Sequence, residues 1–297
     1  MDKIIKVLIV AGTYAPSPVV GGKRFTFLTE ALHKNDFEIH VLTKKESYIK
    51  KKDTSLPVPG LVHRTGMYPP YRINEKKIAK RIFNRIWADY LCLVDPFSGW
   101  VIPSVIKGLS IVKKEKIDVI IATCPMFSTV LIGYLLNVLS GVELIIDYRD
   151  PWSNYPQRYP KIFGRLINEY LEKKAISAAS ALVFCTRMMM EKFEESLGQH
   201  ANAKRFVVTN GYSGGRVVAP ISLGNTKKNM VFAGSLRDER RLNLLAEPLS
   251  RLMQEGLITE DNFCFHIFSK LRKEDQDAID KYFLKDIIQL HSFVPYY

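Results

Sequence analysis

The chain has 297 residues, of which 47% are apolar and 25% are charged, so its composition is that of an ordinary globular protein. This composition excludes the collagen-like, low-complexity and intrinsically disordered classes. The 43 basic residues outnumber the 30 acidic ones and give a net charge of +13. Such an excess suits an anionic partner, which could be nucleic acid, a membrane surface or a phosphorylated small ligand.

Cysteine usage and hydropathy indicate the compartment. The four cysteines (Cys92, Cys124, Cys185 and Cys264) lie far apart without a C-x-x-C pair. This spacing argues against a disulfide framework or a zinc ribbon and favours a reducing cytosol. No stretch reaches the roughly 18 uncharged apolar residues that a membrane span requires. We therefore expect a cytoplasmic protein, either soluble or peripheral on the inner face of the cell membrane.

Strand and helix patterns alternate along the chain, beginning with a largely apolar run at 4–11 that is typical of a central parallel strand. In the first part we predict further strands at 38–42, 118–122, 143–147, 181–185 and 206–209, and helices at 22–33, 73–93, 101–114, 128–139, 165–178 and 187–196. The lysine-rich stretch 44–72, interrupted by prolines, is predicted to be a long connection. In the second part we predict strands at 230–233, 263–268 and 287–290 and helices at 242–254 and 273–283.

Repeated β-α units of this kind predict an α/β fold with open, doubly wound parallel sheets. A stretch rich in Gly, Pro, Ser and Asn interrupts the alternation, so we place an N-terminal domain at 1–212, a linker at 213–228 and a C-terminal domain at 229–297. Ligands of such sheets bind beyond the carboxyl ends of the strands. The candidate functional residues are therefore those that follow a strand.

Two glycines, Gly21 and Gly22, stand between the first strand and the first helix. Glycines at a helix start let backbone N–H groups approach a phosphate, which the helix dipole favours. The pair could equally serve only to turn the chain, and the sequence leaves both interpretations open. The G-x-G-x-x-G fingerprint is absent, and the second strand ends in Thr43-Lys44 where a nicotinamide enzyme would carry an acidic ribose partner. A nicotinamide oxidoreductase is thus a weaker hypothesis.

The segment after the strand 143–147 reads Asp147-Tyr-Arg149-Asp150-Pro-Trp152. Charged side chains packed so densely at a strand end are costly unless they contact each other or a ligand. Arg149 and Asp150 are therefore candidates to contact a substrate. The alternative is an ion pair between Arg149 and a neighbouring carboxylate that stiffens the loop.

A third group, with Gly234, Ser235, Arg240 and Arg241, follows the strand 230–233 and precedes a helix. Arginine at a helix N-terminus opposes the dipole, and a bound diphosphate would compensate through bidentate contacts. The alternative is a surface arginine paired with a neighbouring acidic residue.

Metal chemistry is not expected from the sequence. The D-x-D string at Asp275 and Asp277 lies in a helix flanked by charged residues, and we predict a solvated face there rather than a metal site. The six histidines show no metal-ligand spacing. We therefore predict neither a metal nor another cofactor.

These motifs, taken in order, resemble the retaining glycosyltransferases of the B-type fold, specifically family four and its capsule and O-antigen branch with a D-x-R-D-P-W motif. The matching segments are Gly21-Gly22, 95–100, 118–125, 147–152, 179–185, 209–212 and 232–236 with Arg240. The resemblance implies two Rossmann-like domains, of which the first binds the acceptor and the second the nucleotide-sugar donor. It also implies sugar transfer with retention, without a metal, to a cell-envelope polysaccharide or a lipid-linked acceptor.

The resemblance also implies roles for single residues. Asp150 and Arg149 would be catalytic and face the sugar or the acceptor. The donor would be bound by Gly21, Gly22, Gly234, Ser235, Arg240 and Arg241. Arg240 would neutralise the leaving diphosphate, with Arg241 as its substitute, because charge develops on the diphosphate as it departs.

A basic amphipathic helix is predicted within 73–93, where an apolar face containing Trp87 is surrounded by bases such as Lys77 and Arg81. Such a helix lies in the headgroup region of an anionic membrane, although a core-packed helix with a solvated basic side is equally compatible. Together with Trp152, these three residues form the predicted acceptor or membrane side. We expect no nucleic-acid partner.

The chain stops just before the segment in which the family carries an acidic E-x7-E nucleotide-binding motif. We therefore expect the second domain to be incomplete and this form to be poorly active or inactive. The alternative functions are a non-catalytic truncated fragment or a basic membrane-binding module.

Overall fold

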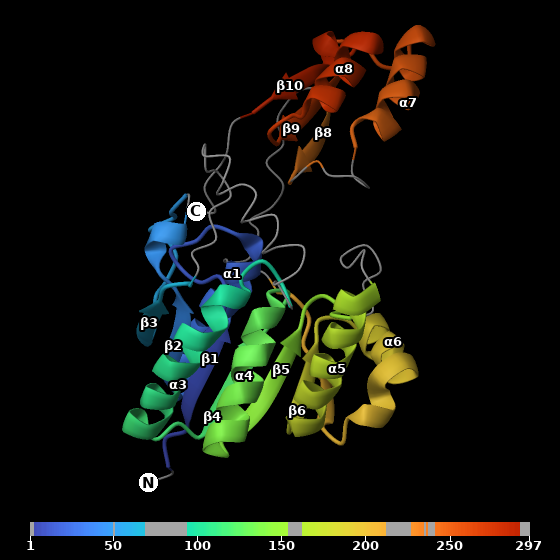
Figure 1. Cartoon of the computed structure of the whole chain (residues 1–297). Helices are drawn as coiled ribbons and strands as arrows, with labels where there is room; N and C mark the ends of the chain where they lie inside the picture. The colour runs from blue at the N-terminus through green and yellow to red at the C-terminus, as the bar shows by residue number, and fades with distance from the viewer. Residues whose placement is uncertain are drawn as a thin grey trace, which may run out of the picture. The chain divides into compact units, whose positions relative to one another are not determined.

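The computed structural model describes residues 3–49, 51–68, 94–153, 162–211, 227–234, 236 and 241–291. The chain divides into two compact units, Met1–Ser213 and Gly214–Tyr297, which we call unit 1 and unit 2. Each unit contains one parallel sheet (Figure 1).

Unit 1 is built on a seven-stranded sheet in the order β3-β2-β1-β4-β5-β6-β7, in which every neighbouring pair is parallel. The strands are β1 (Lys6–Ala11), β2 (Glu38–Lys44), β3 (Leu61–Thr65), β4 (Val119–Thr123), β5 (Glu143–Tyr148), β6 (Ala181–Phe184) and β7 (Lys204–Val207). Central β1 pairs with β2 on one side and β4 on the other, and it is apolar on both faces because each face packs into a core. In the register of the sheet, Ile9 of β1 pairs with Val41 of β2 and with Ile121 of β4.

Helices cover both faces of this sheet. They are α1 (Val20–Lys34), α3 (Val101–Glu115), α4 (Phe127–Ser140), α5 (Ile162–Ala178) and α6 (Arg187–Leu197). Alternate residues of β1 divide between two cores: Val7 and Ile9 pack with Phe25 of α1, whereas Leu8 and Val10 belong to the core beneath α3 and α4. Figure 1 shows α3, α4 and α5 side by side on one face of the sheet. Among the described residues, no helix has the length and apolarity to cross a membrane.

The sequence missed one strand of unit 1. The predicted connection 44–72 contains β3, which pairs with β2 at the edge of the sheet. An edge strand needs no continuous apolar run, and β3 carries His63 and Arg64 while leaving Leu61 57% exposed. Strand β7 begins two residues before the predicted strand at 206–209. The predicted helix at 73–93 lies outside the described residues.

Unit 2 has a three-stranded parallel sheet in the order β10-β9-β8. Its elements are β8 (Lys228–Ala233), α7 (Asn243–Gln254), β9 (Phe263–Phe268), α8 (Lys273–Lys281) and β10 (Ile288–Leu290). The core of this unit is formed by residues such as Phe265, Ile267, Leu249 and Ile279. Doubly wound α/β architecture in unit 1 and further β-α units in unit 2 are thus the fold predicted from the sequence.

One residue of the D-x-D string does not lie on a solvated face. Asp275 is 1% exposed, and its carboxylate accepts hydrogen bonds from the backbone N–H groups of Arg272, at 3.2 Å, and Leu242, at 3.3 Å. It therefore caps α8 and also satisfies a donor at the start of α7. Only Asp277 is exposed as predicted. The solvated-face prediction was wrong for Asp275, which ties two helices together.

Close packing of α4 on the sheet depends on Gly133. A Cβ at this position would lie 2.7 Å from the Cβ of Ala122 in β4 and 2.9 Å from Cδ1 of Leu144 in β5. The Ala122 atom is fixed to a strand backbone, so it has little room to move away. Glycine costs helix propensity at this position, and the close approach of α4 is the compensating gain.

We predict that Gly133→Ala destabilises unit 1 by about 1–3 kcal/mol, because the added methyl group overpacks the core. Chemical denaturation followed by circular dichroism measures the difference. Ser110→Ala on the exposed side of α3 is the control, and it should change stability by less than about 0.5 kcal/mol. A Gly133→Ala protein as stable as the wild type would contradict this account of the packing.

Candidate functional site

The candidate site lies at the carboxyl ends of the central strands of unit 1. The chain passes from β1 to β2 on one side, while β4 adjoins β1 on the other, so the strand order reverses between β1 and β4. Ligands of open parallel sheets bind outside the strand ends at such a switch point. The loops after β1, β4 and β5 meet there and carry the residues described below.

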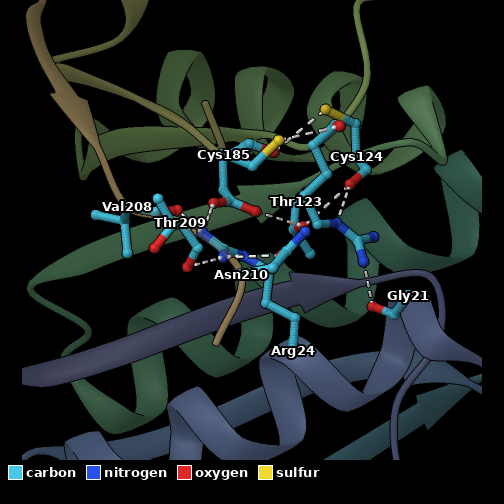
Figure 2. Close-up of polar contacts among 10 residues, drawn as sticks. Gly21, Arg24, Thr123, Cys124, Cys185, Val208, Thr209 and Asn210 are labelled. Atoms are coloured by element: carbon cyan, nitrogen blue, oxygen red, sulfur yellow. Dashed lines mark hydrogen bonds and ion pairs between the residues drawn. The ribbon is translucent and has the colours of Figure 1, made fainter. Parts of the chain in front are cut away.

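Asp147, near the end of β5, is the buried anion of the site. It is 3% exposed, and its two carboxylate oxygens have different partners. Oδ2 accepts a hydrogen bond of 3.0 Å from the Thr123 hydroxyl at the end of β4, and Oδ1 accepts one of 2.9 Å from Nη2 of Arg24 in α1. The carboxylate thus joins two strands and a helix (Figure 2).

Arg24 also binds the segment that follows β7. Its guanidinium donates to the carbonyl oxygens of Val208, at 2.9 Å, and Thr209, at 3.0 Å, and to Oδ1 of Asn210, at 3.1 Å. Figure 2 shows this side chain reaching from α1 toward all of these acceptors and Asp147. Only 11% of the side chain is exposed. Arg24 therefore holds the first helix, the strand β5 and the end of the last strand in one arrangement.

Arg149 follows β5 and lies beside α1. Its Nε donates to the carbonyl oxygen of Cys124 after β4, and Nη1 donates to the carbonyl oxygen of Gly21 (Figure 2). Burial lowers the pKa of Arg149 from its ordinary value, and neighbouring anionic groups partly oppose this shift. An arginine stays charged near neutral pH. Its Nη2 has no acceptor among the described residues.

Asp150, next to Arg149, is only partly buried. No described residue forms a hydrogen bond or ion pair with its carboxylate. The predicted pairing of Arg149 with a carboxylate in its own loop is therefore not a hydrogen-bonded pair, since both donors of Arg149 that are bonded go to backbone carbonyls. Within the described part of this loop, Asp150 and Nη2 of Arg149 remain available for a ligand.

The glycine pair has a packing role in the structure. A Cβ on Gly21 would lie 3.0 Å from Nη1 of Arg149, and a Cβ on Gly22 would lie 3.3 Å from the backbone of Thr13. Helix α1 begins at this point without a side-chain cap or an acidic residue in its first turn. The glycines thus let α1 and the Arg149 guanidinium approach closely, and they place an uncapped helix N-terminus beside a cation.

Trp152 is buried inside unit 1, where it also lines a cavity beside α6, and its predicted place on an acceptor or membrane side stays a prediction. Trp152 is 1% exposed, stacks on Phe127 at 5.3 Å between ring centroids, and donates a hydrogen bond of 2.8 Å to Oδ1 of Asn168. Its side chain fixes the loop after β5 against α4 and α5. A buried indole can position Asp150, but its exposed area is too small for contact with a large partner.

Two further charged residues, Lys44 and Asp95, lie near the carboxyl ends of the strands, and the sequence analysis did not select them as site residues. Lys44 ends β2, and burial lowers its pKa to about 8 in spite of the nearby Asp95 carboxylate. Its ammonium lies 4.0 Å from the centre of the Phe97 ring. Asp95 accepts the N–H groups of Phe97 and Ser128, both at 2.8 Å, and so caps α4.

The remaining predicted site residues lie elsewhere. In unit 2, exposed Gly234 follows β8 and exposed Arg241 precedes α7. Ser235, Arg240, Lys77, Arg81 and Trp87 are outside the described residues. Donor binding by these residues stays a prediction.

One group of described residues has the spacing of a metal site. It lies at the amino ends of the strands, opposite the candidate site. Single ligand atoms of Glu38, His40 and Glu115 are within 4.8 Å of one another. The ammonium of Lys6 lies 2.9 Å from Oε1 of Glu38. A lysine so close to one of the carboxylates supplies positive charge and would repel a metal ion. His40 also bonds His63 at 3.1 Å, which is a structural contact between β2 and β3.

Comparison with solved structures identifies the fold. The chain is similar to sucrose-phosphate synthase from Thermosynechococcus elongatus, with a TM-score of 0.65 and 11% identity over 98% of this chain and 71% of that one. TarM matches with a TM-score of 0.58 and 8% identity, over 99% of this chain and 78% of that one. A UDP-N-acetylglucosamine 2-epimerase matches with a TM-score of 0.51 and 14% identity, over 98% and 70%.

No protein-family model matches the sequence, and no curated protein matches it either. At identities this low the likeness shows the fold alone. That fold is two Rossmann-like α/β units with parallel sheets, of the GT-B type, as the sequence predicts.

We predict that Arg24→Met destabilises unit 1 by about 3 kcal/mol, because it leaves the Asp147 carboxylate buried without its counter-ion. A double-mutant cycle with Asp147→Leu should recover much of this loss. The exposed pair Lys34–Glu30, 2.8 Å apart, is the control, and its coupling should be about 0.3–0.5 kcal/mol. Equal coupling energies for the two pairs, measured by urea denaturation, would refute the buried ion pair as an anchor.

We also predict a pH dependence from Lys44. Below about pH 8 the ammonium is charged in both states, and the folded chain bears the cost of its burial. Between about 8 and the ordinary value of 10.5 the folded chain loses its proton first, so the unfolding free energy of the wild type should rise relative to that of Lys44→Met. Lys113→Met, at an exposed lysine, is the control. A flat difference for Lys44→Met would contradict the lowered pKa.

Proposed function

We propose that the chain is a glycosyltransferase that moves a sugar from a nucleotide-sugar donor to a cell-envelope polysaccharide or a lipid-linked acceptor. The observation that carries this proposal is the loop after β5 at the switch point of unit 1. There Asp150 and Nη2 of Arg149 remain available beside the uncapped N-terminus of α1. A carboxylate, a cation and backbone N–H donors at one strand edge suit a polar ligand that carries phosphate.

We propose that transfer retains the anomeric configuration, as the family-four resemblance implies. Departure of a nucleoside diphosphate develops negative charge on its oxygens, and fixed cations with N–H donors lower the barrier to that step. A carboxylate such as Asp150 can orient the sugar or the acceptor hydroxyl. The leaving phosphate can take the acceptor proton, so the reaction needs no separate general base.

The family-four resemblance implies that Gly234, Ser235, Arg240 and Arg241 of unit 2 bind the donor. Exposed Arg241 stands directly before α7, and exposed Gly234 follows β8. The resemblance to the capsule and O-antigen branch supplies the acceptor class, and the D-x-R-D-P-W segment 147–152 is its main support in the sequence. Buried Trp152 would act there by holding Asp150 in place.

A cavity beside the loop supports an acceptor with an apolar part. It has a volume of about 400 Å³ and opens between α6 and the strand ends, with Pro151, Phe184, Met189 and Phe193 among its lining residues. Aromatic and methionine side chains favour an apolar chain or ring. A lipid-linked acceptor would place such a group next to Asp150.

We predict that Asp150→Asn lowers kcat/KM for sugar transfer by on the order of a hundredfold, equivalent to about 2.7 kcal/mol of transition-state stabilisation. The assay offers the purified chain UDP-, GDP- and TDP-sugars with an extracted lipid acceptor, and NMR of the product determines its anomeric configuration. Asp36→Asn, at an exposed carboxylate before the amino end of β2, is the control and should act like the wild type.

Two results would count against the proposed function. A wild-type chain that neither binds nor turns over any of these donors would agree with the sequence-based expectation of an inactive form, and it would remove the transferase activity from this chain. Transfer that proceeds at the wild-type rate in Asp150→Asn would keep the activity and remove Asp150 from the site.

A further inference from the structure

Helix α4 is apolar on its outer side as well as its inner side. None of its 14 residues is charged. Its inner positions, including Val130 and Leu136, are fully buried against the sheet. Its outer positions Val138 and Leu139 are nevertheless 58% and 60% exposed. A helix that is apolar all round is normally covered on every side, so this one lacks a cover within the described residues.

The neighbouring helices extend the same surface. Helix α4 packs against α3 on one side and α5 on the other, and Figure 1 shows the three in one layer. Ile102 and Ile106 of α3 are 72% and 67% exposed. Leu166 and Tyr170 of α5 are 54% and 60% exposed. Because the inner side of this layer faces the sheet, these side chains lie on its outer side, which we call the outer helical face.

The charge on this face is positive. Helix α3 ends with Lys113 and Lys114, and α5 carries Arg165, Lys173 and Lys174. Two of these bases are paired with acidic groups, because Glu115 lies 3.1 Å from the Lys114 ammonium and Glu169 lies 3.5 Å from Arg165, while Glu172 is buried. Lys113, Lys173 and Lys174 therefore supply the excess positive charge of these helices. An apolar surface of several exposed residues with a basic border is unusual for a freely solvated protein.

We propose that the outer helical face of α3, α4 and α5 docks on the surface of an anionic lipid bilayer. Apolar side chains enter the boundary between headgroups and acyl chains, while the flanking lysines and arginines attract anionic headgroups. A second copy of this chain fits the charge less well, since two such faces would bring like charges together. This inference goes beyond the sugar chemistry proposed above and does not depend on it.

The test is co-sedimentation of the full chain with vesicles, in the absence of any sugar donor. Vesicles of phosphatidylcholine alone are compared with vesicles that also contain phosphatidylglycerol, at low and high salt. The wild type should bind the anionic vesicles more strongly, and salt should weaken the binding. Ile106→Glu combined with Leu139→Glu should reduce the bound fraction by roughly tenfold or more.

Two control variants make the result specific. Val58→Glu, at a 52% exposed position before β3, and Leu257→Glu, at a 62% exposed position in unit 2, also replace an exposed apolar residue with a carboxylate. Both should bind vesicles nearly as well as the wild type. Analytical ultracentrifugation without lipid and a thermal melt accompany each variant.

Four outcomes would overturn the proposal. The first is a wild type that binds neither kind of vesicle, and the second is binding by the face variant that equals wild-type binding. The third is a wild-type dimer that the face substitutions dissociate, which would assign the face to a second copy. The fourth is a large loss of thermal stability in the face variant, which would mean that another segment of the chain covers these residues.

Discussion

The arrangement of unit 1 depends on one buried ion pair, between Asp147 and Arg24. The carboxylate is held by a hydroxyl of β4 on one side and by the arginine of α1 on the other, 2.9 Å away. Charged groups this deeply buried are stable only when each has a partner. The pair therefore fixes the first turn of α1 over the ends of β4 and β5. Through its other hydrogen bonds, Arg24 also fixes Thr209 and Asn210 at the end of the last strand.

The candidate site is a consequence of this anchor. With α1 held in place, the carbonyl of Gly21 becomes an acceptor for Arg149, and the guanidinium closes the space between the loops after β1 and β4. Two of its three nitrogens are thereby committed to the backbone, so the orientation of the third is set before a ligand arrives. Preorganisation of this kind is what stabilises developing charge most effectively. The same contacts leave Asp150 as the carboxylate without a protein partner in the described loop.

The sequence predicted what is local and missed what is not. Buried strands such as β1 and β4 are continuous apolar runs, so their places could be predicted, whereas edge strand β3 is half exposed and carries no such signal. The sequence pattern around Asp275 predicted a solvated residue, because the Leu242 N–H that binds its carboxylate is 33 positions away. Arg24 was not identified for the same reason, since its acceptors lie 123 to 186 positions along the chain. Only a basic residue in an uncapped first helical turn, against the dipole, could have indicated it.

The topology of unit 1 constrains how the two proposed surfaces could work together. Helix α4 starts directly after β4 and α5 starts after the loop that contains Asp150, so both helices run from the candidate site toward the opposite edge of the sheet. The outer helical face therefore lies along the sheet, whereas the candidate site lies at one end of the strands. A bilayer against that side would leave the loop after β5 at its margin, open to water and level with the headgroups. A sugar donor could then enter from solution while a lipid-linked acceptor remained in the membrane, because neither path would cross the other.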